Sequence, residues 1–360
     1  MAAPKIFLTG ASGYVGGDML HALLAAHPDW ESNITVLLRN RAHEPAFRSK
    51  YPKLNLFFAT YDSDSGVATI ESEVAKHELV LHFAVSADHL PSAQAIVSGL
   101  RKRGGGIYIH TSGTDVLLDP RAKPEPLKEA EGERVHVYDD WEGIGELKSL
   151  PDAAPHRNVD KFVLASGTET VRTAIVCPST IYGAGRGPVS QRSHQIYQLT
   201  RLILEQRRGL QFADGRTFWN AVHVFDLSRL YLALVEDAVH TLYPEGGGKG
   251  GGGKATWNSD GYYLVENGIY HWGEIAQRIT SEAKKLGLLP SESVRSVGVE
   301  DQALLEPAGR PVTNYAVRAE AVRARRLLGW APVEGTLEEE IPRIVRSEAR
   351  ALGLEIVDNE

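Results

Sequence analysis

Short apolar runs alternate with helical patterns through the first half of the chain, and this alternation restricts the possible folds most strongly. The runs are KIFLTG (5–10), ITVLLR (34–39), LNLFFAT (54–60), LVLHFA (79–84), IYIHTS (107–112) and VRTAIVCP (171–178). Strands that are apolar along their whole length are typical of a parallel sheet covered by helices on both faces. Helices are expected between them at about 14–26, 67–76, 91–101 and 158–165. The alternation therefore predicts an α/β fold with a Rossmann-type, doubly wound parallel sheet.

The second half of the chain breaks this alternation and predicts a smaller, mixed α/β substrate-binding domain. We expect the NAD(P)-binding domain to comprise residues 1–178 and about 220–243. The substrate-binding domain would comprise about 179–219 and 256–360, with the glycine-rich residues 245–255 as a surface loop. Residues 115–155 are rich in charge, proline and glycine and are expected to be irregular; long irregular segments in compact domains are often functional.

The composition narrows the class of protein. The net charge is −7, from 46 acidic and 39 basic residues, which argues against nucleic acid or an anionic membrane as the main partner. Cys177 is the single cysteine, so no internal disulfide can form, and a reducing compartment is expected. No signal segment and no apolar run of roughly 20 residues is found. We therefore expect a cytoplasmic protein that acts on a small molecule.

The segment TGASGYVGG (9–17) joins the first strand to the first helix, and its glycines are three residues apart. Gly10 would allow the tight turn, Gly13 would let a pyrophosphate approach the backbone, and Gly16 would let the helix pack on the strand. The helix N-terminus would supply free N–H groups for the phosphate. Because the motif lies between a strand and a helix, it predicts a dinucleotide site, to which Ser12, Tyr14 and Val15 would also belong.

The end of the second strand indicates which dinucleotide binds. An acidic residue there would accept a hydrogen bond from a free ribose 2′-hydroxyl, but the sequence LLRNRAH carries Arg39 and Arg41 instead. Arginine forms charge-assisted hydrogen bonds with a phosphate. The sequence therefore favours NADP over NAD, with solvated surface arginines as the alternative.

Several motifs in a fixed order resemble those of the extended short-chain dehydrogenase/reductase family, in its epimerase/dehydratase-like branch. The resemblance covers almost the whole chain and is carried by TGASGYVGG, LVLHFA, IYIHTSGT, CPSTIYGAG, NAVHVFDLSRLYLAL and LLGWAPVEGTLEEEI. Within this family the chain resembles a group of uncharacterised fungal NAD(P)-binding proteins. The resemblance also implies a homodimer formed through a four-helix interface.

The resemblance implies most of the site residues. Ser112 falls on the position of the family's active-site serine, and Lys161 on that of the lysine that binds the ribose hydroxyls. The remaining cofactor contacts that it implies are Asp62, Phe83, Ala84, Val85, Pro178 and Ser179. Tyr182 and Arg186 follow the same segment and are expected to contact the substrate.

The family's catalytic tyrosine is absent from its expected position. Four residues before Lys161 stands Arg157, which does not deprotonate in proteins but could hold a substrate carbonyl or carboxylate. His156 is one candidate for the proton carrier; it lies about 140° from Lys161 on an ideal helix and could face the site only from a non-helical cap after Pro155. Tyr138 is a second candidate and Tyr182 a third.

Two other motifs predict no site. GKGGGGK (248–254) resembles a phosphate-binding loop, but Ala255 follows where that motif requires serine or threonine. His136, Asp139 and Asp140 could bind a metal, but the sequence offers no second group of ligands at a suitable spacing.

The sequence thus favours an NADP-dependent oxidoreductase that transfers hydride between a nicotinamide and a small carbonyl or alcohol. One alternative is a nucleotide-sugar epimerase or dehydratase, which would need a basic pocket for the sugar pyrophosphate, with Arg186 and Arg192 as its candidates. The other is a non-catalytic NADP(H)-binding sensor, which the missing tyrosine would explain.

Overall fold

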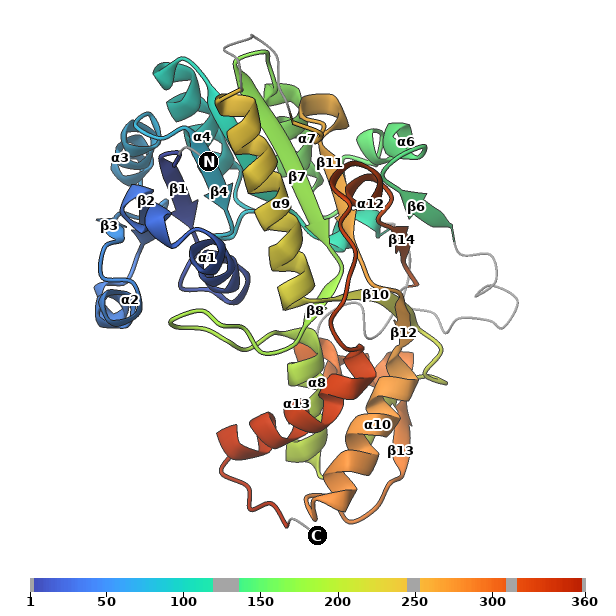
Figure 1. Cartoon of the computed structure of the whole chain (residues 1–360). Coiled ribbons are helices and arrows are strands. Elements are labelled where there is room, and N and C mark those ends of the chain that lie inside the picture. The colour runs from blue at the N-terminus through green and yellow to red at the C-terminus, as the bar shows by residue number, and fades with distance from the viewer. Residues whose placement is uncertain (1–2, 119–135, 245–252, 309–315, 358–360) are drawn as a thin grey trace.

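A seven-stranded parallel sheet forms the centre of the computed structural model, which describes residues 3–118, 136–244, 253–308 and 316–357. The strand order is β11-β7-β5-β4-β1-β2-β3, and every neighbouring pair is parallel (Figure 1). The strands are β1 (Ile6–Thr9), β2 (Ile34–Leu38), β3 (Asn55–Phe58), β4 (Leu79–His82), β5 (Gly106–Thr111), β7 (Val171–Pro178) and β11 (Tyr262–Val265). The predicted Rossmann-type α/β fold is confirmed.

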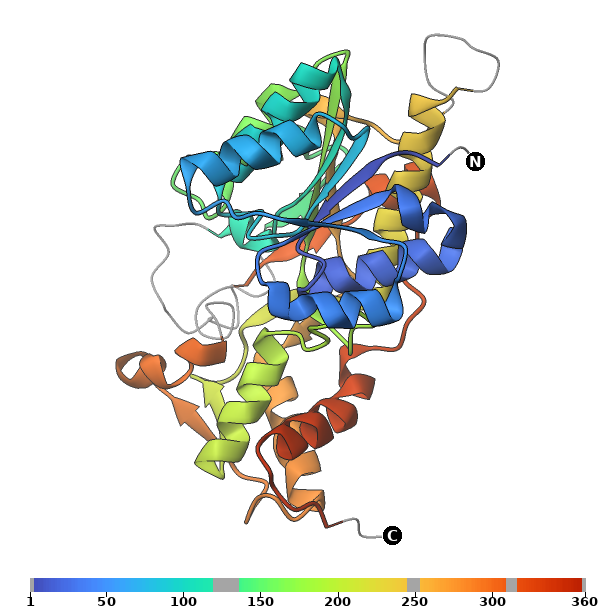
Figure 2. The same cartoon turned by 90° about the vertical axis from the view of Figure 1, so that its left-hand side faces the viewer.

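Helices cover both faces of this sheet (Figure 2). On one face lie α3 (Asp64–Val74), α4 (Leu90–Arg103) and α7 (Arg157–Ser166); on the other lie α1 (Tyr14–Ala26), α2 (Glu44–Lys50) and α9 (Val224–Leu242). Successive strand residues point to opposite faces. Phe7 therefore joins one buried apolar cluster, while Ile6 and Leu8 join the other.

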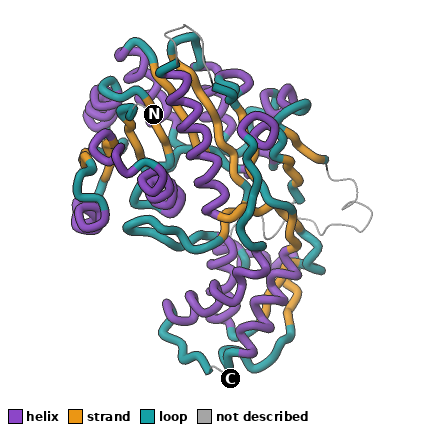
Figure 3. Tube along the Cα trace, viewed as in Figure 1, coloured by secondary structure: helices purple, strands orange, loops and turns teal. Residues whose placement is uncertain are grey.

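A smaller part of the molecule lies below the carboxyl ends of the central strands (Figure 1). Its strands are β8 (Thr180–Tyr182), β10 (Phe218–His223) and β12 (Ile269–His271) in one sheet, and β9 (Gly209–Phe212) with β13 (Val294–Val297) in another. Its helices are α8 (Gln195–Gln206), α10 (Trp272–Lys285) and α13 (Leu337–Ala351). Loops run between the two parts (Figure 3).

The remaining elements are short. Beside the central sheet lie β6 (Val137–Asp139), β14 (Arg318–Glu320), α6 (Ile144–Lys148) and α12 (Arg323–Leu328). The 3₁₀ turns are η1 (Pro28–Asn33), η2 (Arg41–His43), η3 (Thr114–Leu117), η4 (Asn258–Asp260), η5 (Val299–Leu304) and η6 (Glu306–Ala308). Part of the segment expected to be irregular, 119–135, lies outside the described residues, as does 245–252 of the glycine-rich loop.

Two strands depart from the expected division into domains. β11, expected in the substrate domain, is the edge strand of the central sheet, because its four buried residues YYLV pair in parallel with β7. β10, assigned in part to the cofactor domain, pairs instead with β8 and β12 in the small sheet. Across the described ranges, no helix combines the length and apolar character that crossing a membrane requires.

Candidate cofactor site and active site

The glycine turn after β1 packs closely against the end of β4. Gly10 has a φ of 77°, and a Cβ at this position would lie 2.7 Å from the backbone nitrogen of Ala84. A Cβ on Gly16 would lie 2.5 Å from the carbonyl oxygen of Gly10. No side chain caps the first turn of α1 at Gly13. The N–H groups of this turn are therefore available to a phosphate, as the motif predicts.

A cavity of about 510 Å³, here called the cofactor cavity, opens beside this turn. It is lined by Gly10, Ser12, Gly13, Leu37, Arg39, Asn40, His43, Tyr61, Asp62, Phe83, Ala84, Val85 and His89. Most of the cofactor residues expected from the sequence thus lie together. Val85 adopts a left-handed φ of 48°, which is costly for a β-branched residue and is characteristic of functional sites. The glycine cradle, the free helix N-terminus and the cavity together fit a dinucleotide.

The two arginines after β2 have different environments. Arg39 is exposed, lines the cofactor cavity, and has no ion-pair partner within the described part of the chain. Arg41 lies outside the cavity lining, and its guanidinium stacks 4.0 Å above the ring of Phe58. Arg39 is therefore open to the cavity in which a 2′-phosphate was expected, whereas Arg41 is not, because stacking directs Arg41 onto β3.

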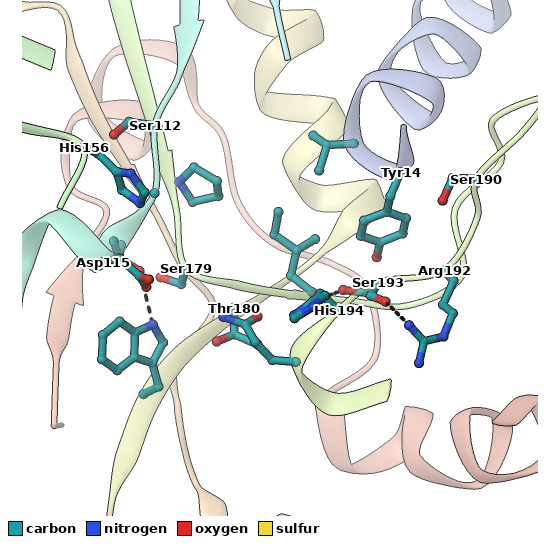
Figure 4. A pocket seen from close by; sticks show the side chains of 17 residues that line it. Tyr14, Ser112, Asp115, His156, Ser179, Thr180, Ser190, Arg192, Ser193 and His194 are labelled. Atoms are coloured by element: carbon teal, nitrogen blue, oxygen red, sulfur yellow. Dashed lines mark hydrogen bonds between the residues drawn. The ribbon is translucent and has the colours of Figure 1, made fainter. Parts of the chain in front are cut away.

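A second cavity of about 510 Å³, here called the active-site cavity, lies between the central sheet and the smaller part. It is lined by Tyr14, Val15, Ser112, Gly113, Thr114, Asp115, His156, Pro178, Ser179, Thr180, Ile181, Ser190, Arg192, Ser193, His194, Gln195 and Trp219. Figure 4 shows Ser112 and His156 at one end, with Tyr14 and Arg192 at the other. The cavity therefore joins Ser112, Pro178 and Ser179, as expected, to the first turn of α1.

Helix α7 presents other residues to this cavity than the family motif implies. Arg157 is buried, and its guanidinium donates to the carbonyl oxygens of Lys148 and Leu150. Lys161 is 58% exposed and binds the carboxylate of Asp152, and it lines neither cavity. The structure therefore does not bring Lys161 to the cofactor, nor Arg157 to the substrate. Residues one position apart on a helix point about 100° apart. The side of α7 nearest the cavity therefore carries His156 and Asp160, which stand one position before Arg157 and Lys161.

His156 lies in a non-helical cap, the one position from which the sequence predicted that it could face the site. It is the N-cap residue of α7, with a left-handed φ of 63°, and its ring points into the active-site cavity. Its Nδ1 lies 2.7 Å from Oδ1 of Asp88, and a Cβ on Gly113 would lie 3.6 Å from its Nε2. Asp88 belongs to the turn that Val85 starts, in which the N–H of Asp88 donates to the carbonyl of Val85.

Asp160 is fully buried behind Ser112. Its Oδ2 accepts hydrogen bonds from the hydroxyls of Ser112 and Tyr262, each 2.9 Å away. Its Oδ1 lies 3.6 Å from Nε2 of His110, and neither of these two atoms has a hydrogen-bond partner among the described residues. Burial in this cluster raises the pKa of Tyr262 well above its usual value, as does the nearby Asp160 carboxylate. Ser112 therefore directs its only hydroxyl proton away from the cavity.

Four other residues considered from the sequence have structural partners. Tyr138 lies on β6 against His136 and lines neither cavity. The hydroxyl of Tyr182 donates to the carbonyl of Gly335, outside both cavity linings. The remaining two are arginines with buried carboxylate partners: Arg186 binds Asp18 and stacks on Phe225, and Arg192 lines the active-site cavity but binds Glu348. Tyr138 and Tyr182 are thus not placed as proton carriers, and Arg186 is not placed at the substrate.

The three residues considered for a metal face different partners. His136 binds Glu146, Asp139 accepts from the N–H groups that follow it, and Asp140 accepts from the N–H groups of Leu264, Val322 and Arg323. Over the residues for which coordinates are described, no group of three or more histidine, cysteine or acidic side chains could hold a metal. Most of the segment 248–254 lies outside the described residues.

The sequence comparison finds one clear relative. The chain is 34% identical over 358 residues to the oxidase ucsJ of an Acremonium species, covering 97% of this chain and 99% of the relative. The chain belongs to the family of this fungal oxidase. No family model matches the chain.

Solved structures share the fold at low sequence identity. The dTDP-glucose 4,6-dehydratase DesIV of Streptomyces venezuelae, solved with NAD bound, matches at 18% identity and a TM-score of 0.62, covering 96% of this chain and 97% of the dehydratase. The UDP-glucuronic acid 4-epimerase of Bacillus cereus, also solved with NAD, matches at 13% identity and a TM-score of 0.61, covering 96% and 99%. These likenesses show that the chain shares the fold of the dehydratase and the epimerase, as expected from the resemblance of its motifs.

The two carboxylates that hold His156 and Ser112 were missed from the sequence. Asp88 and Asp160 both lie beside the cavity through contacts that join distant segments. A signal for Asp160 was present: Val159 and Val163 form the apolar stripe of α7, and Asp160 lies within that stripe. No local pattern singles out Asp88.

Proposed function

We propose that the protein is an NADP-dependent oxidoreductase that transfers hydride between the nicotinamide and a small carbonyl or alcohol. The observation that carries the proposal is the pair of adjoining cavities, one beside a dinucleotide turn and the other lined by Ser112 and His156. The name of the fungal relative, an oxidase, agrees with redox chemistry. NADP(H) would supply the hydride donor or acceptor when it is bound.

Different residues of the chain would bind the cofactor in one cavity and act on the substrate in the other. The α1 N-terminus would bind the pyrophosphate, and Arg39 and His43 line the cofactor cavity where a 2′-phosphate would need positive charge. His156 would exchange the substrate proton, since imidazole is the side chain suited to proton transfer near neutral pH. Pro178 and Ser179 would contact the nicotinamide side.

The nucleotide-sugar alternative receives less support from the active-site cavity. A sugar pyrophosphate needs unpaired cations, but the guanidinium of Arg192 is held by buried Glu348, and Arg186 is held by buried Asp18 outside the cavity. The sensor alternative predicts cofactor binding without turnover. His156 argues against it, because a strained backbone places a titratable ring in the cavity.

A fluorescence titration with NADPH and with NADH tests the cofactor part of the proposal. We expect the wild type to bind NADPH at least tenfold more tightly than NADH. Arg39→Ala should weaken NADPH binding about tenfold or more, a loss of about 1.4 kcal/mol, and leave NADH binding unchanged. Arg41→Ala is the matched control and should change neither. Equal affinities would contradict NADP specificity, and binding of neither cofactor would refute the oxidoreductase.

A further inference from the structure

The active-site cavity presents two polar atoms beside each other where His156 meets Ser112. Nε2 of His156 lies over Gly113, the residue that follows Ser112, and both side chains line the same end of the cavity (Figure 4). A substrate oxygen bound at this end would lie near both side chains. Whether these atoms donate or accept hydrogen bonds therefore decides which chemical group the cavity binds.

The proton of His156 is directed away from the cavity by Asp88. The Asp88 side chain is 66% exposed, and a solvated carboxylate can only accept a hydrogen bond at neutral pH. The contact of 2.7 Å therefore requires the hydrogen on Nδ1. In the neutral ring, Nε2 then faces the cavity with a lone pair.

The proton of Ser112 is directed away by a different carboxylate. Its hydroxyl donates to Oδ2 of Asp160, which is fully buried and receives a second hydroxyl from Tyr262. The oxygen of Ser112 therefore also presents lone pairs to the cavity. Asp88 in the turn after β4 and Asp160 on α7 thus each accept the proton of a cavity side chain, and leave that side chain with lone pairs toward the cavity.

We propose that the cavity binds its substrate as an alcohol, with Nε2 of His156 as the catalytic base and with Asp88 and Asp160 as positioning residues. This inference rests on the proposed function and adds the class of substrate to it. The carbinol carbon loses a hydride to NADP⁺, the oxidant of that function. The O–H proton passes to Nε2, and the O–H electron pair becomes the second carbon–oxygen bond of the carbonyl product. Water then removes the proton from the ring.

Several charged groups surround this end of the cavity. Asp88 contacts the ring, Asp115 comes from η3, and Asp160 lies one turn further along α7; Arg192 lies at the opposite end (Figure 4). The described surroundings of the ring are therefore mainly acidic.

The kinetic test uses short secondary alcohols with NADP⁺ and the matching ketones with NADPH. His156→Gln should lower kcat about 100-fold or more with little change in KM. Asp88→Asn keeps an acceptor for Nδ1 but also offers an N–H donor, which permits the Nε2–H tautomer, so kcat for the alcohol should fall at least about tenfold with little change in KM. Asn158→Ala, an exposed site on the same helix, is the control and should change neither. An unchanged kcat in Asp88→Asn would overturn the proposal.

A second measurement does not need the cofactor. The ¹⁵N NMR shifts of His156, assigned with His156→Gln, should show the Nδ1–H tautomer in the free protein, and Asp88→Ala should mix the two tautomers. An Nε2–H tautomer in the wild type would overturn the proposal. If NADPH fails to bind, the proposed function fails while this measurement still decides how the ring is oriented.

Discussion

The buried contact between Asp160 and Tyr262 gives the sharpest prediction about stability. Both side chains are at most 1% exposed, and the phenol donates to Oδ2 at 2.9 Å. Asp160→Ala removes this acceptor and leaves the phenol with the weakly accepting sulfur of Cys177 as its neighbour. An unpaired buried hydroxyl costs about 1–3 kcal/mol. Together with the small cavity, the free energy of unfolding should fall by about 3 kcal/mol.

A double-mutant cycle isolates the part that belongs to the hydrogen bond. Tyr262→Phe alone should cost about 1.5 kcal/mol, since it removes a hydrogen bond to a carboxyl group. In the Asp160→Ala background the same change removes an unpaired hydroxyl and should cost nothing. The coupling energy should therefore be about 1.5 kcal/mol.

Urea denaturation followed by circular dichroism measures the four proteins at one pH. Asn158→Ala on the exposed face of α7 is the control and should leave the unfolding free energy unchanged. The m-values should agree, so that the comparison concerns the same unfolding reaction. A coupling energy below about 0.5 kcal/mol would show that the two groups act independently, and the reasoning would be refuted.

Two further predictions concern buried ionisable groups. Arg186→Ala leaves fully buried Asp18 without its bidentate partner. Thermal and urea unfolding should show that the free energy of unfolding falls by about 2 kcal/mol, less than for a fully buried pair because Arg186 is one-third exposed. An unchanged free energy of unfolding would contradict the role of this ion pair. Burial lowers the pKa of His77, whose ring binds Thr35. Below a pH of about 6.5 the unfolded chain therefore takes up a proton that the folded chain does not, and the free energy of unfolding should decrease as the pH is lowered. In His77→Gln the slope of unfolding free energy below pH 6 should be smaller by up to about 1.4 kcal/mol per pH unit, whereas exposed His240→Gln should keep the wild-type slope; equal slopes in both variants would contradict this cause.

The fold and the glycine turn could be predicted well because their signals are local. Strands that are apolar on both faces predict a parallel sheet covered by helices, and the glycines of TGASGYVGG predict the turn after β1. The division into domains was less predictable. β11 and β10 could be recognised as strands, but the strand that each one pairs with depends on contacts between distant segments.

The residues of the active site were the hardest to predict from the sequence. The spacing between position 157 and Lys161 matched the family, yet the rotation of α7 about its axis places Arg157 against the Leu150 carbonyl and Lys161 on Asp152. That rotation is set by burial of Val159 and Val163, which brings Asp160 inward with them.

The sequence by itself therefore determined the apolar strands, the glycine turn after β1 and the position of Ser112 directly after β5, since each depends on residues that are close together in the chain. The tertiary structure decided which residues complete the site. His156 reaches the cavity through a left-handed N-cap, and Asp88, 68 residues earlier, meets it only because the turn after β4 lies beside α7. Local patterns fix the periodicity of a helix, whereas packing fixes which side of it faces the cavity.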